Sequence, residues 1–189
     1  MKKITLLLCA IALILIGTNA QVVMEVGPDK TFTTLKAAWD AAAVETATDI
    51  TINVAEGTYV ESATLTAISG KNITITGAGA DKTIVKRKET TTFTLPGTEG
   101  WVTSNANRLF QLNANSDNLS LTLEKMSFET MGYNNANGGG VINADGYNQQ
   151  FVFRNCNFKN VLARAGAIIQ VQGNDSLLLV KLDHCFVED

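Results

Sequence analysis

The residues that could do chemistry in this 189-residue chain are few and lie mostly in its second half. The catalytic candidates, all weak, are four charged side chains that could gather on one outer face: Arg154, Lys159, Arg164 and Asp183. A basic side chain in such a cluster could abstract a proton from a substrate as a general base. The competing interpretation is a solvated ladder of alternating charges, and we prefer it because the signs alternate at a regular spacing.

The remaining candidate sites are weaker still. His184 is the only imidazole, and we expect it to be a solvated turn residue. Asp145 and Asp183 could be calcium ligands, but hard cations require several clustered oxygens and the sequence shows no acidic cluster. The glycines at 77–80 lack the Gly-Lys-Ser/Thr of a phosphate loop, so they indicate a turn. We therefore expect no metal and no cofactor.

The composition describes one ordered domain. Hydrophobic residues make up 46% of the chain and charged residues 17%, which excludes a disordered protein. The formal net charge of -3 gives no electrostatic case for nucleic acid as a partner.

Residues 1–20 have the three-part layout of a bacterial secretory signal. A basic start precedes an apolar run from Ile4 to Ile16, and small residues follow at 17–20. The run is too short to span a membrane, so we expect cleavage after Ala20 and no membrane span in the mature form. The mature domain, residues 21–189, should then be exported to the periplasm, the cell surface or the medium.

The second half of the chain repeats itself about every thirty residues. The equivalent positions Met126, Cys156 and Cys185 lie 30 and 29 residues apart, each within a block of short, alternating, β-rich segments. Glycine, asparagine and aspartate bound these segments, as is typical of strands and turns. The repeat predicts a solenoid of stacked parallel coils, whereas an antiparallel sandwich would give no reason for the period.

Stacking the blocks puts like side chains above one another. The inward columns are apolar throughout, and the two outward columns alternate negative, positive, negative, which avoids repulsion between neighbouring coils. The inward columns are Leu121/Phe151/Val180, Leu123/Phe153/Leu182, Met126/Cys156/Cys185 and Phe128/Phe158/Val187, and the outward ones are Glu124/Arg154/Asp183 and Glu129/Lys159/Glu188.

Two cysteines remain after removal of the signal, Cys156 and Cys185. Parallel Cα–Cβ vectors suit disulfide geometry poorly, so we expect two buried, reduced thiols stacked inward. An oxidising compartment would permit a disulfide, which is the alternative.

The first half contains one predicted helix, over residues 33–44. Leu35, Ala38, Trp39 and Ala42 recur at helical spacing, and Thr33 or Thr34 can cap its start. This helix should cover the open end of the solenoid. Short strands are predicted at 50–54, 56–61, 72–77 and 83–86.

Three runs in this half carry a family resemblance: FTTLKAAWDAA at 32–42, INVAEGTYVE at 52–61 and KNITITGAGADKTI at 71–84. Together they resemble the opening of pectin methylesterases and, more broadly, right-handed parallel β-helix proteins of the pectin-lyase-like superfamily. The resemblance covers about residues 26–87. It implies an all-β, single-stranded parallel β-helix with a short N-terminal capping helix.

The later half departs from the chemistry that the resemblance implies. The place for the family's Gln-Ala-Val segment has 140–143 (GVIN), and the place for a following aspartate has 158–162 (FKNVL). The sequence ends directly after a strand block, so we expect further coils beyond residue 189 that would hold most of an active site.

Two functions stay open at this point. In one, the protein binds or degrades acidic polysaccharide, pectin-like or uronate-containing, as a polysaccharide lyase or carbohydrate esterase. The other is a non-catalytic cell-surface or adhesion module. The missing acid–base set favours the second for the residues given.

Overall fold

The structure is a computed structural model. It describes residues 21–61, 63–86, 109–112, 115–133, 140–163, 166–172 and 179–188. The predicted signal at 1–20 and the candidate Arg164 therefore lie outside the described residues.

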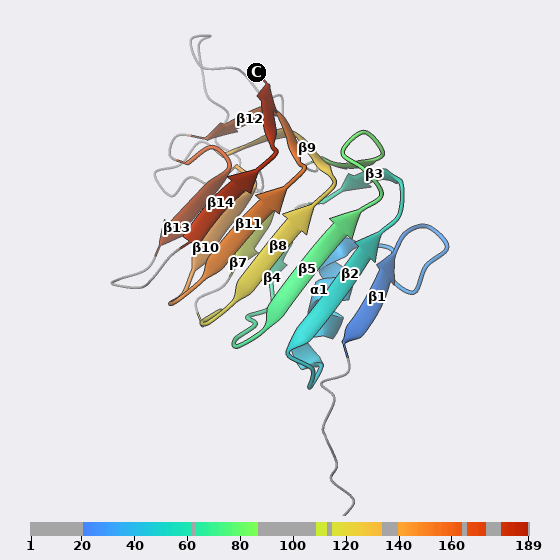
Figure 1. The fold of residues 1–189 in the computed structure, drawn as a ribbon, viewed down its shortest axis with the longest axis vertical. Coiled ribbons are helices and arrows are strands. Elements are labelled where there is room, and N and C mark those ends of the chain that lie inside the picture. Colours follow the sequence, from blue (N-terminus) through green and yellow to red (C-terminus); the bar gives the residue numbers. More distant parts are fainter. Residues whose placement is uncertain are drawn as a thin grey trace, which may run out of the picture.

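Fifteen described strands form three parallel sheets (Figure 1). Sheet A contains, in spatial order, β1 (Val22–Val26), β2 (Asp49–Val54), β5 (Asn72–Gly77), β8 (Ser120–Glu124), β11 (Gln150–Arg154) and β14 (Leu179–Asp183). Sheet B contains β3 (Gly57–Val60), β6 (Thr83–Lys86), β9 (Ser127–Tyr133), β12 (Asn157–Ala163) and β15 (Phe186–Glu188). Sheet C contains β4 (Ala63–Leu65), β7 (Phe110–Leu112), β10 (Ile142–Asp145) and β13 (Ile169–Gln172).

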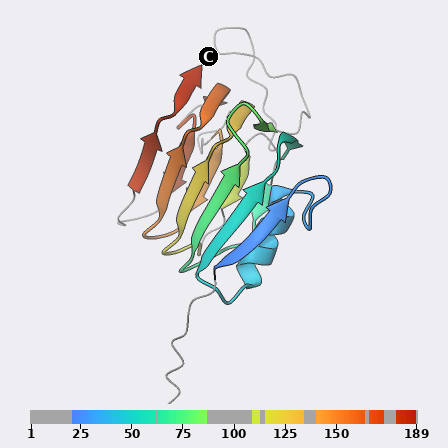
Figure 2. The same cartoon turned by 45° about the vertical axis from the view of Figure 1, so that its right-hand side comes forward.

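The chain visits sheet A, then sheet B, then sheet C, and returns to sheet A one strand further along. Each such circuit is one coil, and the coils stack with their strands side by side (Figures 1 and 2). The fold is a right-handed parallel β-helix, because parallel crossovers take that hand. The predicted solenoid is confirmed, and the antiparallel sandwich is wrong because each strand pairing is parallel.

The predicted register of the repeat is also confirmed. Phe151 lies between Leu121 and Val180, and Phe158 lies between Phe128 and Val187. Equivalent residues of the β8 and β11 coils are 30 apart in sequence, as in the contact between Arg154 and Glu124. The coil before them is longer, since Thr76 and Glu124 are 48 apart.

The inward side chains of the three sheets form one continuous core from the first coil to the coil of β11 and β12. On β14 and β15, the last strands described, the inward-column residues Val180, Leu182 and Val187 are exposed. Phe128, Phe153 and Phe158 are buried and form an aromatic cluster. The rings of Phe128 and Phe158, on adjacent coils, stack with centroids 5.4 Å apart, and Phe153 meets Phe158 edge-on at 5.4 Å. Such contacts stabilise the stack beyond simple burial.

Helix α1 (Leu35–Val44) covers the N-terminal end of this core, as predicted. Thr34 caps it, its hydroxyl oxygen accepting a hydrogen bond from the Ala37 backbone N–H at 3.1 Å. Trp39 is buried and donates its indole N–H to the Thr66 carbonyl at 2.8 Å, which ties the helix to the first full coil. No helix of the described segments has the length and apolar character needed to cross a bilayer.

A buried carboxylate joins the helix to the first coil. Glu61 follows β3 and is 6% exposed, and one of its oxygens accepts the Leu35 backbone N–H at 2.7 Å. Burial raises the pKa of Glu61, while the hydrogen bonds from Leu35 and Lys36 act in the opposite direction. The carboxylate satisfies N–H groups that every helix start leaves without a partner.

Replacing Glu61 separates its hydrogen bonding from its charge. We expect Glu61→Ala to lower the free energy of unfolding by about 1–3 kcal/mol, because buried N–H groups lose their acceptor. Glu61→Gln keeps an acceptor and should stay within about 1 kcal/mol of the wild type.

The pH dependence of urea unfolding provides the second readout. An acid whose pKa is raised in the fold favours folding most below its unfolded pKa, and this contribution declines as pH rises through the folded pKa. The decline should be smaller in Glu61→Gln than in the wild type. Equal losses of stability in both variants would contradict the proposed role.

The corners of the stack use left-handed backbone. Lys125, Asn155 and His184 each follow a strand of sheet A and have φ of 56°, 52° and 51°. This confirms the turn predicted at His184. A second column interrupts sheet B, where Thr130 and Asn160 have φ of 55° and 51° and are left out of the β9–β12 register. Asparagine tolerates this conformation, whereas a β-branched threonine there is strained.

Exchanging the two residue types tests this strain. Thr130→Asn should stabilise the protein by about 1 kcal/mol, and Asn160→Thr should destabilise it by a similar amount. Thermal unfolding of the two variants beside the wild type measures both shifts. Shifts of the same sign would show that backbone strain does not govern this corner.

Candidate functional site

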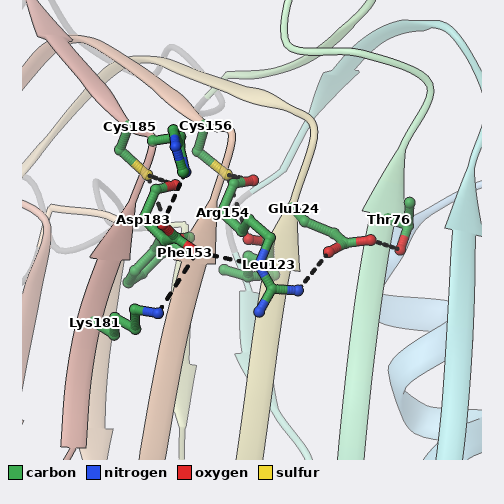
Figure 3. Close-up of polar contacts among 10 residues, drawn as sticks. Thr76, Leu123, Glu124, Phe153, Arg154, Cys156, Lys181, Asp183 and Cys185 are labelled. Carbon is green, nitrogen blue, oxygen red and sulfur yellow. Dashed lines mark hydrogen bonds and ion pairs between the residues drawn. The ribbon is translucent and has the colours of Figure 1, made fainter.

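The predicted charge ladder exists on the outer face of sheet A (Figure 3). The Arg154 guanidinium lies between the carboxylates of the two neighbouring coils, 3.3 Å from Glu124 and 3.5 Å from Asp183. The other Glu124 oxygen accepts a hydrogen bond from the Thr76 hydroxyl at 3.0 Å. The side chains thus run in sequence across four adjacent strands, β5, β8, β11 and β14.

Besides Arg154, Asp183 has two further basic side chains beside its carboxylate. Lys181 lies 3.6 Å from its carboxylate (Figure 3). His184 Nδ1 lies 2.8 Å from the same carboxylate. Slight desolvation acts to raise the pKa of Asp183, but Lys181, His184 and Arg154 outweigh it and hold the pKa below its ordinary value. His184 itself is 81% exposed in its side chain, as expected of a turn residue.

The three sequence candidates that the structure describes do not form one cluster. Arg154 and Asp183 meet on sheet A, whereas Lys159 lies on β12 of sheet B, 3.9 Å from Glu188. Lys86 and Glu129, 3.1 Å apart, continue this column of charges on β6 and β9 of the same sheet.

Both ladders place each cation against a carboxylate of a neighbouring coil. This arrangement favours one register of the strands, because a strand shifted along its neighbour would separate each cation from its carboxylate. The side chains of Arg154 and Lys159 are 46% and 42% exposed, so each pair contributes little stability. The ladder interpretation accounts for these contacts without a catalytic role.

The two thiols stack at the corner beside the ladder (Figure 3). Cys156 is fully buried and Cys185 half-buried, and both are free. Each donates its S–H to a carbonyl of the preceding coil at 3.4 Å, Cys156 to Leu123 and Cys185 to Phe153. Burial raises the pKa of Cys156 to about 12, so this thiol is a poor nucleophile.

The outer face of sheet C carries a row of amides that the sequence analysis did not single out. Gln111, Asn143 and Gln170 occupy one register position on β7, β10 and β13. Asn143 is 3% exposed and donates from Nδ2 to the Gln111 side-chain oxygen at 3.0 Å. The signal was present in the repeated pattern of a polar residue between apolar ones.

Sheet C supplies little acid–base chemistry. Its four strands hold one ionisable side chain, Asp145, which comes two residues after Asn143. The segment at 140–143, where the resemblance implied a Gln-Ala-Val run, instead leads into the amide row. Within the described ranges, no group of three or more His, Cys, Asp or Glu side chains could hold a metal.

A small pocket of about 200 Å³ lies at the start of α1. Thr34, Tyr59 and Glu61 are among its lining residues, and the Tyr59 hydroxyl donates to the Ala55 carbonyl at 3.0 Å. Burial raises the pKa of Tyr59. The pocket is smaller than typical ligand cavities. Its Thr34, Tyr59 and Glu61 side chains form hydrogen bonds within the protein.

Comparison with solved structures gives likenesses to pectin methylesterases. The chain is similar to pectin methylesterase PemA from Erwinia chrysanthemi, with 14% identity and a TM-score of 0.46 over 88% of this chain and 48% of that one. It is also similar to the pectin methylesterase from Aspergillus niger in deglycosylated form, with 16% identity and a TM-score of 0.42 over 88% and 57%. This chain thus spans about half the length of either structure. No protein-family model and no curated protein matches the sequence.

Reversing the charge at Arg154 tests the ladder. We expect Arg154→Glu to lower the free energy of unfolding by about 1 kcal/mol in low salt, because the new carboxylate would face those of Glu124 and Asp183. Arg154→Met removes the attraction without adding repulsion and should cost less. Urea unfolding in low and high salt measures both, since screening should shrink the loss in Arg154→Glu. A loss that is equal in both variants and independent of salt would show that the charges do not act as a ladder.

Proposed function

We propose that this protein is an exported polysaccharide-binding β-helix that holds a polymer along its outer surface. The carrying observation is the regular repetition of polar side chains on that surface. Thr51, Thr74 and Thr122 lie side by side on the outer face of sheet A, and each is half-exposed. Neighbouring strands are about 4.8 Å apart, so such rows offer equivalent contacts at fixed intervals.

A surface of this kind fits a polymer better than a small molecule. A polysaccharide repeats its hydroxyl groups along its length and can meet several coils at once, which adds weak contacts together. The pocket at α1 is small, and the Thr34, Tyr59 and Glu61 side chains in its lining form hydrogen bonds within the protein. The resemblance of the N-terminal half to pectin methylesterases supports an acidic, pectin-like or uronate-containing polymer as the ligand.

The second candidate function is a non-catalytic cell-surface or adhesion module. It is favoured by the contacts of Arg154 and Lys159, each of which lies against a carboxylate of a neighbouring coil. A lyase or esterase needs a positioned, available acid or base. The charged candidates Arg154, Lys159, Arg164 and Asp183 remain a proposal for catalysis only if a substrate displaces these partners.

Binding and turnover can be measured on residues 21–189. Affinity electrophoresis in gels containing polygalacturonate, methylated pectin or a glycosaminoglycan gives the binding. Ultraviolet absorbance of unsaturated product and release of methanol report lyase and esterase activity. The heat-unfolded protein is the control for adventitious association.

We expect retarded migration in at least one of the two pectic polymers and no product from either. Product formation by these residues would favour the enzyme over the adhesion module. Equal migration in all gels would contradict polysaccharide binding altogether.

A further inference from the structure

An aromatic side chain is exposed at the corner where the chain passes from sheet C back to sheet A. Tyr147 lies between β10 and β11 and is 54% exposed. Tyrosine offers a flat apolar face with a polar tip, which suits it to a binding surface.

The backbone of Tyr147 is fixed from two sides by the preceding coil. Its N–H donates to the Asp117 carboxylate at 2.8 Å, and its carbonyl accepts from the Asn118 backbone N–H at 2.8 Å. Asp117 is itself held, since its carbonyl accepts from the Ser69 hydroxyl at 2.8 Å and the Gly70 N–H at 2.9 Å. The ring is therefore carried by an ordered corner that links three coils.

Two exposed amides share this corner. Asn118 and Asn148 occupy equivalent positions with φ of 53° and 51°, and Asn148 Nδ2 donates to Asn118 Oδ1 at 2.8 Å. That single contact engages one atom of each amide. The amide oxygen of Asn148 and the amide nitrogen of Asn118 belong to exposed residues and can serve a ligand.

We propose that Tyr147, with the Asn118 and Asn148 amides, forms a platform that binds one sugar ring of a polysaccharide. This inference rests on the proposed function and names the residues that contact the polymer. A pyranose has an apolar C–H face, which can lie on the tyrosine ring, and a rim of hydroxyls, which exchange hydrogen bonds with amides. Preordered side chains lower the entropic cost of such binding.

Charge narrows the kind of ring that fits. The carboxylate of Asp117, on the preceding coil, lies 2.8 Å from the Tyr147 backbone nitrogen. A uronate carboxylate would be repelled there, whereas an esterified or neutral ring would not. The platform therefore favours the uncharged rings of an otherwise acidic polymer.

The experiment compares ring removal with ring replacement in residues 21–189. The probes are methylated pectin and polygalacturonate, and the variants are Tyr147→Ala and Tyr147→Trp. Val60→Ala is the matched control, because Val60 is 60% exposed on sheet B, on another face of the stack. Dissociation constants come from affinity electrophoresis. The tryptophan emission of Tyr147→Trp, compared with that of the wild type and its two native tryptophans, reports contact independently.

We expect Tyr147→Ala to bind methylated pectin at least about tenfold more weakly, as removal of a central aromatic contact does. Val60→Ala should bind like the wild type, and Tyr147→Trp should bind and shift its emission on addition of the polymer. The effect should be smaller with polygalacturonate.

Two other results are possible, and each identifies which idea fails. If the wild type and Tyr147→Ala bind methylated pectin equally, the platform is wrong while the proposed function stands. If the wild type binds neither polymer and the Tyr147→Trp emission does not change, both the proposed function and the platform are wrong.

Discussion

Parallel, in-register stacking of coils is the constraint on which the rest of this structure depends. Each side chain lies about one strand spacing from its counterpart in the next coil, so every position is in effect a column. An apolar column becomes core, as with Phe128 and Phe158. A charged column must alternate in sign, as it does from Glu124 through Arg154 to Asp183. A corner column must accept left-handed backbone at each level.

The same stacking leaves only the outer surface of the molecule available to a ligand. The interior is filled by side chains, and the thiols at Cys156 and Cys185 point inward to carbonyl groups of the preceding coil. The charges of the two ladders pair across neighbouring coils. The surface available to a ligand is the regular polar outer face and its corners, where residues of several coils meet. At one corner, a hydrogen bond to Asp117 fixes the backbone of Tyr147.

Much of the fold could be predicted from the sequence because columns leave a periodic trace. The thirty-residue repeat yielded the β8–β11–β14 register, and the spacing of Leu35 to Ala42 yielded the capping helix. Strands β1 and β4 were missed, because β1 belongs to no repeat block and β4 has only three residues. The candidate site was predicted less well. Charge type identified Arg154 and Asp183, but the separation of Lys159 onto sheet B depends on the corner between them.

Nuclear Overhauser contacts between side chains of the inward columns test the central claim most directly. In residues 21–189 labelled at methyl and aromatic positions, the account predicts contacts from Leu121 to Phe151 and from Phe151 to Val180. It predicts none from Leu121 to Val180, which are two strand spacings apart. Direct contacts between Leu121 and Val180, or the close Hα–Hα pairs of antiparallel strands, would contradict the stacked parallel coil and everything inferred from it.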